Sequence, residues 1–212
     1  LSAMGDVAMA VPVLRAFTQQ YPDVKLTVLT RKFFKPLFRD LKNVSVYSAD
    51  LKAKHKGPFG LFKLSKELRT LHCDAVADIH NVLRSKILKP MLGIRKVATI
   101  DKGRKEKKQL VIGKNFAPLK TTHQRYADVF ETLGYRIVLS NPTFPELASL
   151  NQNCLELIGT PNKKRIGIAP FAAHESKMYP LEQMEQVIEK LSEDYQVVLF
   201  GGGKNTARNS RC

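Results

Sequence analysis

The chain has 212 residues, of which 43% are hydrophobic and 25% charged, a balance typical of soluble globular proteins. No apolar run reaches the roughly 18 residues of a membrane-spanning helix. The net charge of +16, from 35 basic and 19 acidic residues, favours a polyanionic partner such as nucleic acid, an acidic membrane face or a phosphorylated substrate. The absence of Trp and of a motif that interleaves basic and aromatic residues argues against nucleic acid, which we do not expect as a partner.

Three cysteines, an odd number without metal-ligand spacing, predict free thiols in a reducing compartment, and we expect a cytoplasmic protein. They are Cys73, Cys154 and Cys212, and Cys73, just before a predicted strand, is expected to be buried. No His, Cys, Asp or Glu cluster predicts a metal site. Neither a P-loop nor the glycine motif of dinucleotide-binding proteins is present, so we expect no cofactor.

Predicted helices and strands alternate along the first two thirds of the chain. In chain order they are helix 7–20, strand 25–30, helix 33–41, strand 44–47, helix 60–71, strand 74–79, helix 82–92, strand 96–100 and helix 122–133. Pro12 either kinks the first helix or opens its main part. This β-α order predicts an α/β fold with a parallel, doubly wound sheet and helices on both faces.

The first predicted helix has no strand before it, because the chain begins in the turn. We therefore expect an apolar strand before Leu1, in a position that is usually central in such a sheet. Residues 1–140 are the predicted N-terminal Rossmann-like domain, and the Pro- and Asn-rich residues 141–164, with a short helix at 146–158, are a predicted connector. Strand 165–169, helix 180–192 and strand 196–200 predict that residues 165–212 begin a second, incomplete domain of the same type, which about 100 further residues or more would complete.

A Gly-Asp pair opens the chain. Gly5 is expected to let the backbone turn sharply into the helix, which places Asp6 at the helix N-terminus and at the carboxyl end of a strand, where ligands bind α/β proteins. Asp6 has two interpretations, an N-cap whose oxygen accepts a helix N–H, or a functional carboxylate at the mouth of a site. This segment alone does not choose between them.

A second group of candidate residues follows strand 165–169. A loop of small residues, including Ala172 and Ala173, leads to Lys177, which stands three positions before Pro180 at a predicted helix start. Free N–H groups at a helix start favour an anion, and a Lys beside them adds a mobile positive charge for phosphate. The alternative is a solvated surface lysine.

Together the two segments resemble glycosyltransferase family 9, the lipopolysaccharide heptosyltransferases. The resemblance rests on Ser2-Ala3-Met4-Gly5-Asp6 running into Val11-Pro12-Val13-Leu14-Arg15, and on the strand, Pro, small residues, Lys, aromatic and Pro of residues 168–180. Residues 78–85 are similar to the family's acceptor-side loop. Each motif is moderately specific by itself, and the order and separation of the motifs also match those of the family.

The resemblance implies the GT-B arrangement, in which two Rossmann-like domains face each other across a cleft. It implies inverting transfer of a heptose from ADP-heptose to the inner core of lipopolysaccharide. Asp6 matches the general base, and Lys177 matches the residue that neutralises the diphosphate leaving group. Ala172 and Ala173 stand where many members carry hydroxyl side chains, and backbone N–H groups are expected to contact the phosphates in their place. The donor site is incomplete without later family segments, so residues 1–212 alone are expected to be inactive.

The expected acceptor is an anionic, lipid-linked oligosaccharide. The protein is expected in the cytoplasm, and peripheral contact with the cytoplasmic face of the inner membrane is compatible with this acceptor. The predicted acceptor-binding residues are Gly5, His80, Asn81, Arg84, His123, Arg125, Lys54 and Lys56. Two basic runs, at residues 52–56 and 102–108, are either solvated mobile loops or contacts to anionic groups of the acceptor or the membrane. His80 is equally compatible with a structural role. A competing hypothesis is a basic α/β module without catalysis that binds a phosphorylated glycan or nucleic acid.

Overall fold

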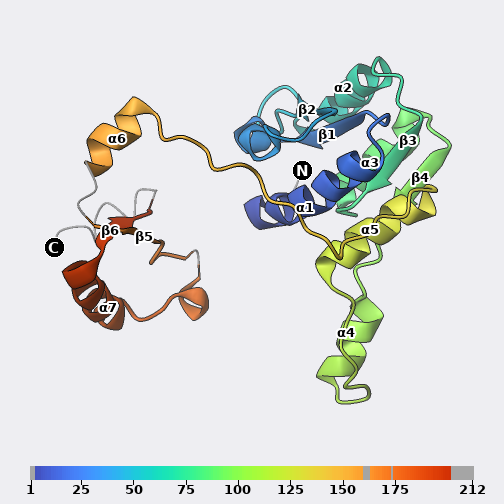
Figure 1. Ribbon diagram of the computed structural model, residues 1–212. Coiled ribbons are helices and arrows are strands. Elements are labelled where there is room, and N and C mark those ends of the chain that lie inside the picture. The colour runs from blue at the N-terminus through green and yellow to red at the C-terminus, as the bar shows by residue number, and fades with distance from the viewer. Residues whose placement is uncertain (1–2, 160–162, 173, 202–212) are drawn as a thin grey trace. The chain divides into compact units, whose positions relative to one another are not determined.

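The computed structural model describes residues 3–159, 163–172 and 174–201. It divides the chain into two compact units, Leu1–Glu146 and Leu147–Cys212, which are drawn in Figure 1. The division falls inside the connector expected at residues 141–164. Ala173 lies outside the described residues.

Two pairs of parallel strands form the centre of the first unit. β1 (Leu26–Thr30) pairs with β2 (Val44–Ser48), and β3 (Ala75–Asp78) pairs with β4 (Lys96–Thr99). These strands and their parallel direction confirm the sequence prediction. Within the described residues no ladder of hydrogen bonds joins β1 to β3, so the two pairs do not form the single sheet that was predicted. The two pairs instead pack against the same apolar core.

Helices cover both faces of these strands, as predicted for a doubly wound fold. On one face α1 (Met4–Gln20) and α5 (Thr122–Thr132) pack against Val28 and Val46. On the other face α2 (Gly57–Arg69) and α3 (Leu83–Leu92) pack against Leu29 and Tyr47. Neighbouring residues of a strand point to opposite faces, which is why Val28 and Leu29 belong to different cores.

Helix α1 is the main apolar element of the first unit. Val13 and Phe17 are each 1% exposed, and the ring centroids of Phe17 and of Phe130 in α5 are 4.8 Å apart. The helix runs unbroken through Pro12, although proline removes one helical hydrogen bond. Burial of this face against α5 outweighs that local cost.

Several elements differ from the prediction. Residues Lys32–Phe38 form a 3-10 helix (η1) with Pro36 inside it, where an α-helix at 33–41 was expected. The second basic run is not a loop, because Arg104–Val111 forms helix α4 after Gly103, which adopts a left-handed conformation. The short helix expected at 146–158 is confined to α6 (Gln152–Ile158), which starts where Asn151 caps it. Cys73 is exposed and not buried.

The second unit contains one parallel strand pair. β5 (Arg165–Ile168) pairs with β6 (Gln196–Leu199), and α7 (Leu181–Asp194) connects them after a short 3-10 helix, η2 (Glu175–Lys177). This order confirms the predicted strand-helix-strand unit. None of the helices that the structure describes is long and apolar enough to cross a membrane.

The aromatic contact between α1 and α5 leads to a prediction about stability. Phe17→Ala should lower the free energy of unfolding by about 3–5 kcal/mol, because it empties a site that is 1% exposed. Phe59→Ala is the matched control, since Phe59 is 90% exposed and its removal should change stability by less than about 0.5 kcal/mol. Urea denaturation of both variants measures the difference, and equal losses would contradict the described core.

Candidate functional site

A buried carboxylate at the end of β3 organises the loop that leads to the candidate site. Asp78 is 6% exposed, and its Oδ1 accepts hydrogen bonds from the backbone N–H groups of His80 at 3.1 Å and Asn81 at 2.7 Å. Its Oδ2 lies 2.8 Å from Nζ of Lys89 in α3. Burial alone would raise the pKa of Asp78, but Lys89 and the donors around the carboxylate lower it below 3.8 overall. Asp78 is therefore an anion that fixes a turn.

The turn after Asp78 is closed by further hydrogen bonds. Asn81 has a φ of 47°, a left-handed conformation that Asn tolerates better than most residues. Its side-chain amide donates to the carbonyl of Ile100 at 3.3 Å, and Ser85 Oγ accepts from the N–H of Val82 at 3.0 Å. Both ends of the loop are thus held, which sets the position of His80 between them.

Asp6 lies beside His80. The distance from Asp6 Oδ2 to His80 Nδ1 is 3.9 Å, longer than a hydrogen bond, and the Asp6 side chain is 53% exposed. Ala3 occupies the N-cap of α1, so the interpretation of Asp6 as the N-cap is wrong. Asp6 instead stands in the first helical turn, where its charge is favoured, and forms no hydrogen bond with any described residue. Its oxygens are therefore accessible to a ligand.

Gly5 does not make the sharp turn expected of it. It lies inside the first turn of α1, and it is not among the described glycines with positive φ. A Cβ built on Gly5 would meet no atom within 4 Å. The described residues therefore leave open space beside Asp6, and no packing contact explains the glycine.

The charge of Asp6 also reaches α5. Burial raises the pKa of Tyr126, and the negative charge of Asp6 raises it further. Burial lowers the pKa of His80 below 6.5, the positive charge of Lys102 adds to this shift, and Asp6 opposes it. Tyr126 was missed in the sequence because it reads as one more apolar residue of an amphipathic helix. At neutral pH the site thus combines an exposed carboxylate with a neutral imidazole.

The first basic run is partly neutralised within the protein. His55 is 3% exposed, its Nδ1 accepts from the N–H of Asp50 at 3.0 Å, and its Nε2 lies 3.1 Å from Glu67. Lys54 forms an ion pair of 2.7 Å with the same carboxylate and is the main cause that lowers the pKa of Glu67 to about 2. In turn Glu67 raises the pKa of Tyr47 to about 12. Lys56, by contrast, is exposed.

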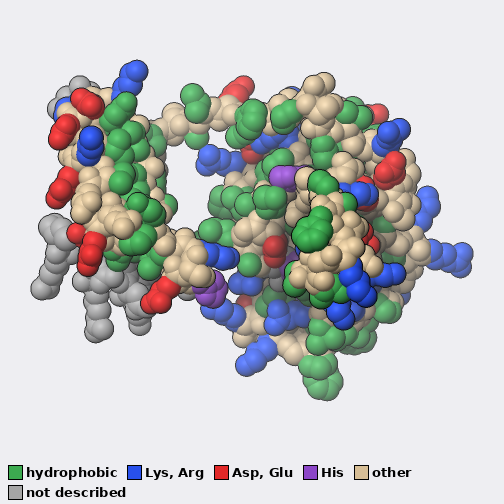
Figure 2. Space-filling view, turned by 90° about the horizontal axis from the view of Figure 1, so that it is seen from below, with side chains coloured by type: hydrophobic (Ala, Val, Ile, Leu, Met, Phe, Trp, Pro, Cys, Tyr) green, Lys and Arg blue, Asp and Glu red, His purple; other side chains and the backbone are tan. Residues whose placement is uncertain are grey.

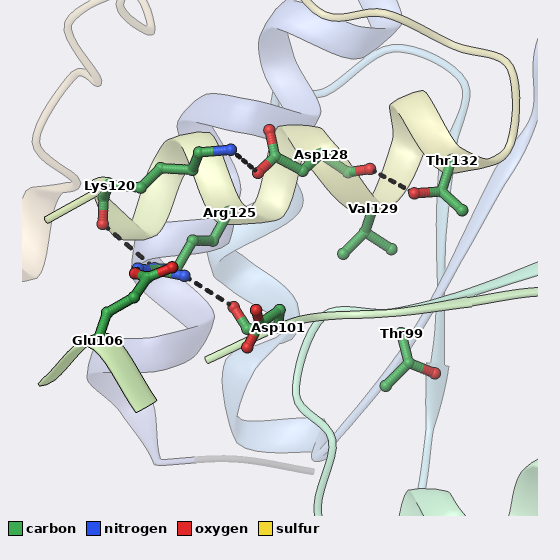
Figure 3. A pocket seen from close by; sticks show the side chains of 8 residues that line it. All are labelled: Thr99, Asp101, Glu106, Lys120, Arg125, Asp128, Val129 and Thr132. Carbon is green, nitrogen blue, oxygen red and sulfur yellow. Dashed lines mark hydrogen bonds and ion pairs between the residues drawn. The ribbon is translucent and has the colours of Figure 1, made fainter. Parts of the chain in front are cut away.

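Arg125 is buried and not an exposed ligand. Its Nη2 is 2.6 Å from Glu106 in α4, its Nη1 donates to the carbonyl of Asp101, and its Nε donates to the carbonyl of Lys120. Figure 3 shows these groups around a polar pocket of about 180 Å³. Each nitrogen of the guanidinium has a partner, so in this structure Arg125 attaches α4 to α5.

The other predicted acceptor residues are dispersed over the first unit. Arg84 is exposed in the first turn of α3 and lies in the same loop-helix segment as His80 and Asn81. His123 lines a separate, mainly apolar pocket beside Pro12, and its Nε2 is buried without a hydrogen-bond partner among the described residues. The described geometry brings together Asp6, Gly5, His80 and Asn81, whereas Lys54 and Arg125 belong to ion pairs of their own.

The predicted donor residues lie in the second unit. Ala172 and Lys177 are exposed. Lys177 is the last residue of η2, and its backbone N–H donates to the carbonyl of His174 at 3.0 Å. Pro180 is the N-cap of α7 and not its first helical residue, so the prediction was off by one position. The described part of the chain contains no group of three or more His, Cys, Asp or Glu that could hold a metal ion.

Comparison with known proteins shows the family of the chain. The sequence model of glycosyltransferase family 9 (heptosyltransferase) matches residues 61–211, and the chain belongs to this family. Lys177 lies inside the matched range and Asp6 lies before it. A curated relative, the lipopolysaccharide core heptosyltransferase OpsX of Haemophilus influenzae, is 29% identical over 109 residues, which make up 51% of this chain and 30% of the relative.

Solved structures share the fold. The family 9 glycosyltransferase of Veillonella parvula superposes with a TM-score of 0.73 at 17% identity, over 98% of this chain and 62% of that one. The ADP-heptose lipopolysaccharide heptosyltransferase II of E. coli gives a TM-score of 0.65 at 20% identity, over 97% of this chain and 63% of that one. The structure of E. coli heptosyltransferase WaaC with ADP gives a TM-score of 0.64 at 19% identity, over 99% of this chain and 69% of that one. The chain thus spans less than a third of its curated relative and about two thirds of these solved proteins.

The Asp78 turn leads to a prediction about pH and stability. Asp78→Asn should lower the free energy of unfolding at neutral pH by about 3 kcal/mol, because it leaves Lys89 without its buried partner. The pKa of Asp78 is lowered in the folded state, so its contribution is complete above pH 3.8 and is lost as the pH falls through the folded value. Urea midpoints across this range measure the effect. Asp74→Asn is the control, because Asp74 is exposed at the other end of β3. A loss of unfolding free energy in Asp78→Asn that does not change with pH would refute the ion pair.

The Asp6–His80 contact leads to a second prediction. The pKa of His80 should lie below 6.5, and Asp6→Asn should lower it further, because the carboxylate is one of the charges that favour the imidazolium. NMR titration of the five histidines, with the His80 signal assigned from a His80→Gln variant, measures both values. Asp23→Asn, an exposed carboxylate elsewhere in the first unit, should leave the His80 pKa unchanged. A rise of that pKa in Asp6→Asn would show that the two groups do not interact as described.

Proposed function

We propose that the protein is an inverting glycosyltransferase that moves a heptose from ADP-heptose to a sugar of the lipopolysaccharide inner core. The observation that carries the proposal is the Asp6 carboxylate, which is 53% exposed and has no hydrogen bond with a described residue, in a chain that belongs to family 9. A structural carboxylate would be paired, as Asp78 is, whereas a general base must be reachable by its substrate.

Asp6 acts as the general base in this proposal. The acceptor hydroxyl attacks the anomeric carbon of the heptose, and Asp6 takes the hydroxyl proton while the bond to the diphosphate breaks. Inversion requires the acceptor to attack from the face opposite the leaving group. No described residue lies within 4 Å of a Cβ built on Gly5, and we propose that the acceptor sugar approaches the carboxylate through this space. His80, whose pKa is lowered below 6.5 by burial, is neutral at pH 7, so Asp6 forms no ion pair with it and its oxygens stay available to the acceptor hydroxyl.

Lys177 serves the leaving group. Negative charge develops on the ADP diphosphate as it separates, and a positioned ammonium lowers the barrier by neutralising that charge. The N–H groups around Ala172 and Ala173, together with those at the start of α7, supply further donors for phosphate. The exposure of Lys177 leaves its ammonium available for such a ligand.

The acceptor-binding residues are proposed to follow the Asp78 turn. His80 and Asn81 lie in the turn, and Arg84 stands exposed in the helix that follows it. Arg presents a planar pair of donors that matches the carboxylate of an acidic sugar. We place the lipid-linked, anionic acceptor here, at the cytoplasmic face of the inner membrane.

The test is enzymatic and uses the full-length protein with ADP-heptose and an inner-core acceptor. Asp6→Asn should lower kcat by about 10²–10⁴-fold and leave the KM for the donor nearly unchanged, because the base acts only in the transition state. Lys177→Met should lower kcat by about 10²–10³-fold. Released ADP measures turnover in both cases.

Matched controls separate chemistry from general loss of charge. Asp23→Asn and Lys190→Met remove exposed charges of the same type from each unit and should keep normal turnover. Full activity of Asp6→Asn would refute the assignment of the base. Wild-type protein that binds phosphorylated glycan or nucleic acid but releases no ADP would instead support the non-catalytic basic module.

A further inference from the structure

Helix α4 and the turn after it carry apolar residues that no other described part of the first unit covers. Val111 is 85% exposed, Ile112 51% and Phe116 82%. The Phe116 ring lies back over the turn, where its Cζ would be 3.8 Å from a Cβ on Gly113. The N–H of Lys114 donates to the carbonyl of Gln109 at 2.9 Å and closes the turn. These three residues, the apolar tip, stand at the end of α4 that points away from the rest of the first unit (Figure 1).

The other end of α4 is firmly attached. Glu106 pairs with the buried Arg125 at 2.6 Å, and the guanidinium packs so closely on Gly103 that a Cβ there would lie 2.3 Å from Nη2. The N–H of Gly103 also donates to Asp101 Oδ1 at 2.8 Å. Every residue of α4 is at least partly exposed. The contacts at its first turn nevertheless fix the direction of the helix and hold the apolar tip outward.

Basic side chains surround the helix behind the tip. Arg104, Lys105, Lys107, Lys108 and Lys114 are all exposed. Helical spacing puts Lys107 next to Val111 and Lys108 next to Ile112, each four residues apart. Figure 2 views the molecule from the side towards which α4 projects and shows hydrophobic and basic side chains next to one another there.

We propose that the apolar tip inserts into the surface of an anionic lipid membrane, with the lysines of α4 against the headgroups. A helix with an apolar part and a basic part binds at the membrane interface through buried apolar area and attraction to anionic lipid. Exposed apolar clusters of this kind mark interaction sites. The surface is distinct from the Asp6 site, and vesicles without any sugar acceptor test it independently of the proposed transfer reaction.

A lipid surface engages both the lysines of α4 and the apolar tip. A soluble polyanion would use the lysines and gain nothing from Val111, Ile112 and Phe116. Another exposed apolar surface of the first unit is the start of α2, where Phe59 is 90% and Phe62 51% exposed near Lys56. That helix lies against α3 with Leu61 and Leu64 buried, so it does not project as α4 does.

The chain contains no Trp, so a single introduced Trp reports on one position. Phe116→Trp should show a blue-shifted emission and protection from aqueous quenchers on addition of mixed phosphatidylcholine–phosphatidylglycerol vesicles, and no change with phosphatidylcholine alone. Phe59→Trp is the matched control and should stay unshifted with either vesicle. A shift for Phe59→Trp but not Phe116→Trp, or for neither, would overturn the proposal.

Binding measurements test the two components separately. Val111→Ser with Ile112→Ser should weaken vesicle binding by at least about tenfold. Lys105→Gln with Lys107→Gln and Lys108→Gln should weaken it by about 100-fold, and more at low salt. Lys32→Gln with Lys35→Gln and Lys42→Gln removes the same charge elsewhere and should have a much smaller effect. Equal losses in the two lysine sets, or an equal shift of Phe116→Trp with heparin in place of vesicles, would show a general polyanion effect and not lipid docking.

Discussion

The candidate site depends on one buried carboxylate. Asp78 ends β3, accepts hydrogen bonds from the two N–H groups that follow it and pairs with Lys89 of α3. Because both of its oxygens are engaged, the loop leaves the strand in a fixed direction and carries His80 to within 3.9 Å of Asp6. The two carboxylates thus have opposite environments: Asp78 is satisfied and structural, whereas Asp6 is exposed and reachable. That contrast, rather than the acidity of either residue, separates a positioning group from a group that can accept a proton.

The large positive charge of the chain is likewise divided between two roles. Lys54, Lys89 and Arg125 are held in ion pairs inside the first unit and stabilise the fold. The basic residues of α4 are exposed and adjoin apolar side chains, so they remain available to a partner. Arg125 connects the two roles, because its internal ion pair with Glu106 is what orients the exposed helix. Net charge alone indicates that a polyanion is favoured, but only the partners of each cation show where it would bind.

The sequence predicted much of the fold. Alternating β-rich and helical segments located all the strands described in both units, and the period of apolar residues located α1, α2, α3, α5 and α7. It failed where local chemistry was ambiguous. Helix α4 has few apolar residues and a run of lysines, which is also the composition of a loop. Residues 33–41 contain Pro36, which favours the shorter 3-10 segment, and Cys73 was expected to be buried only from its residue type.

Residue types, motif order and apolar periodicity determined the α/β class, the resemblance to family 9 and the selection of Asp6, His80 and Lys177, because these depend on patterns that are local in the chain. The tertiary structure decided which of these groups meet. It placed His80 of the β3–α3 loop beside Asp6 of α1, added Tyr126 of α5 to their surroundings, and buried Arg125 and His55 in networks of their own. Such outcomes depend on contacts between residues 12 to more than 100 positions apart, and on burial, which sets the pKa and the reach of each side chain.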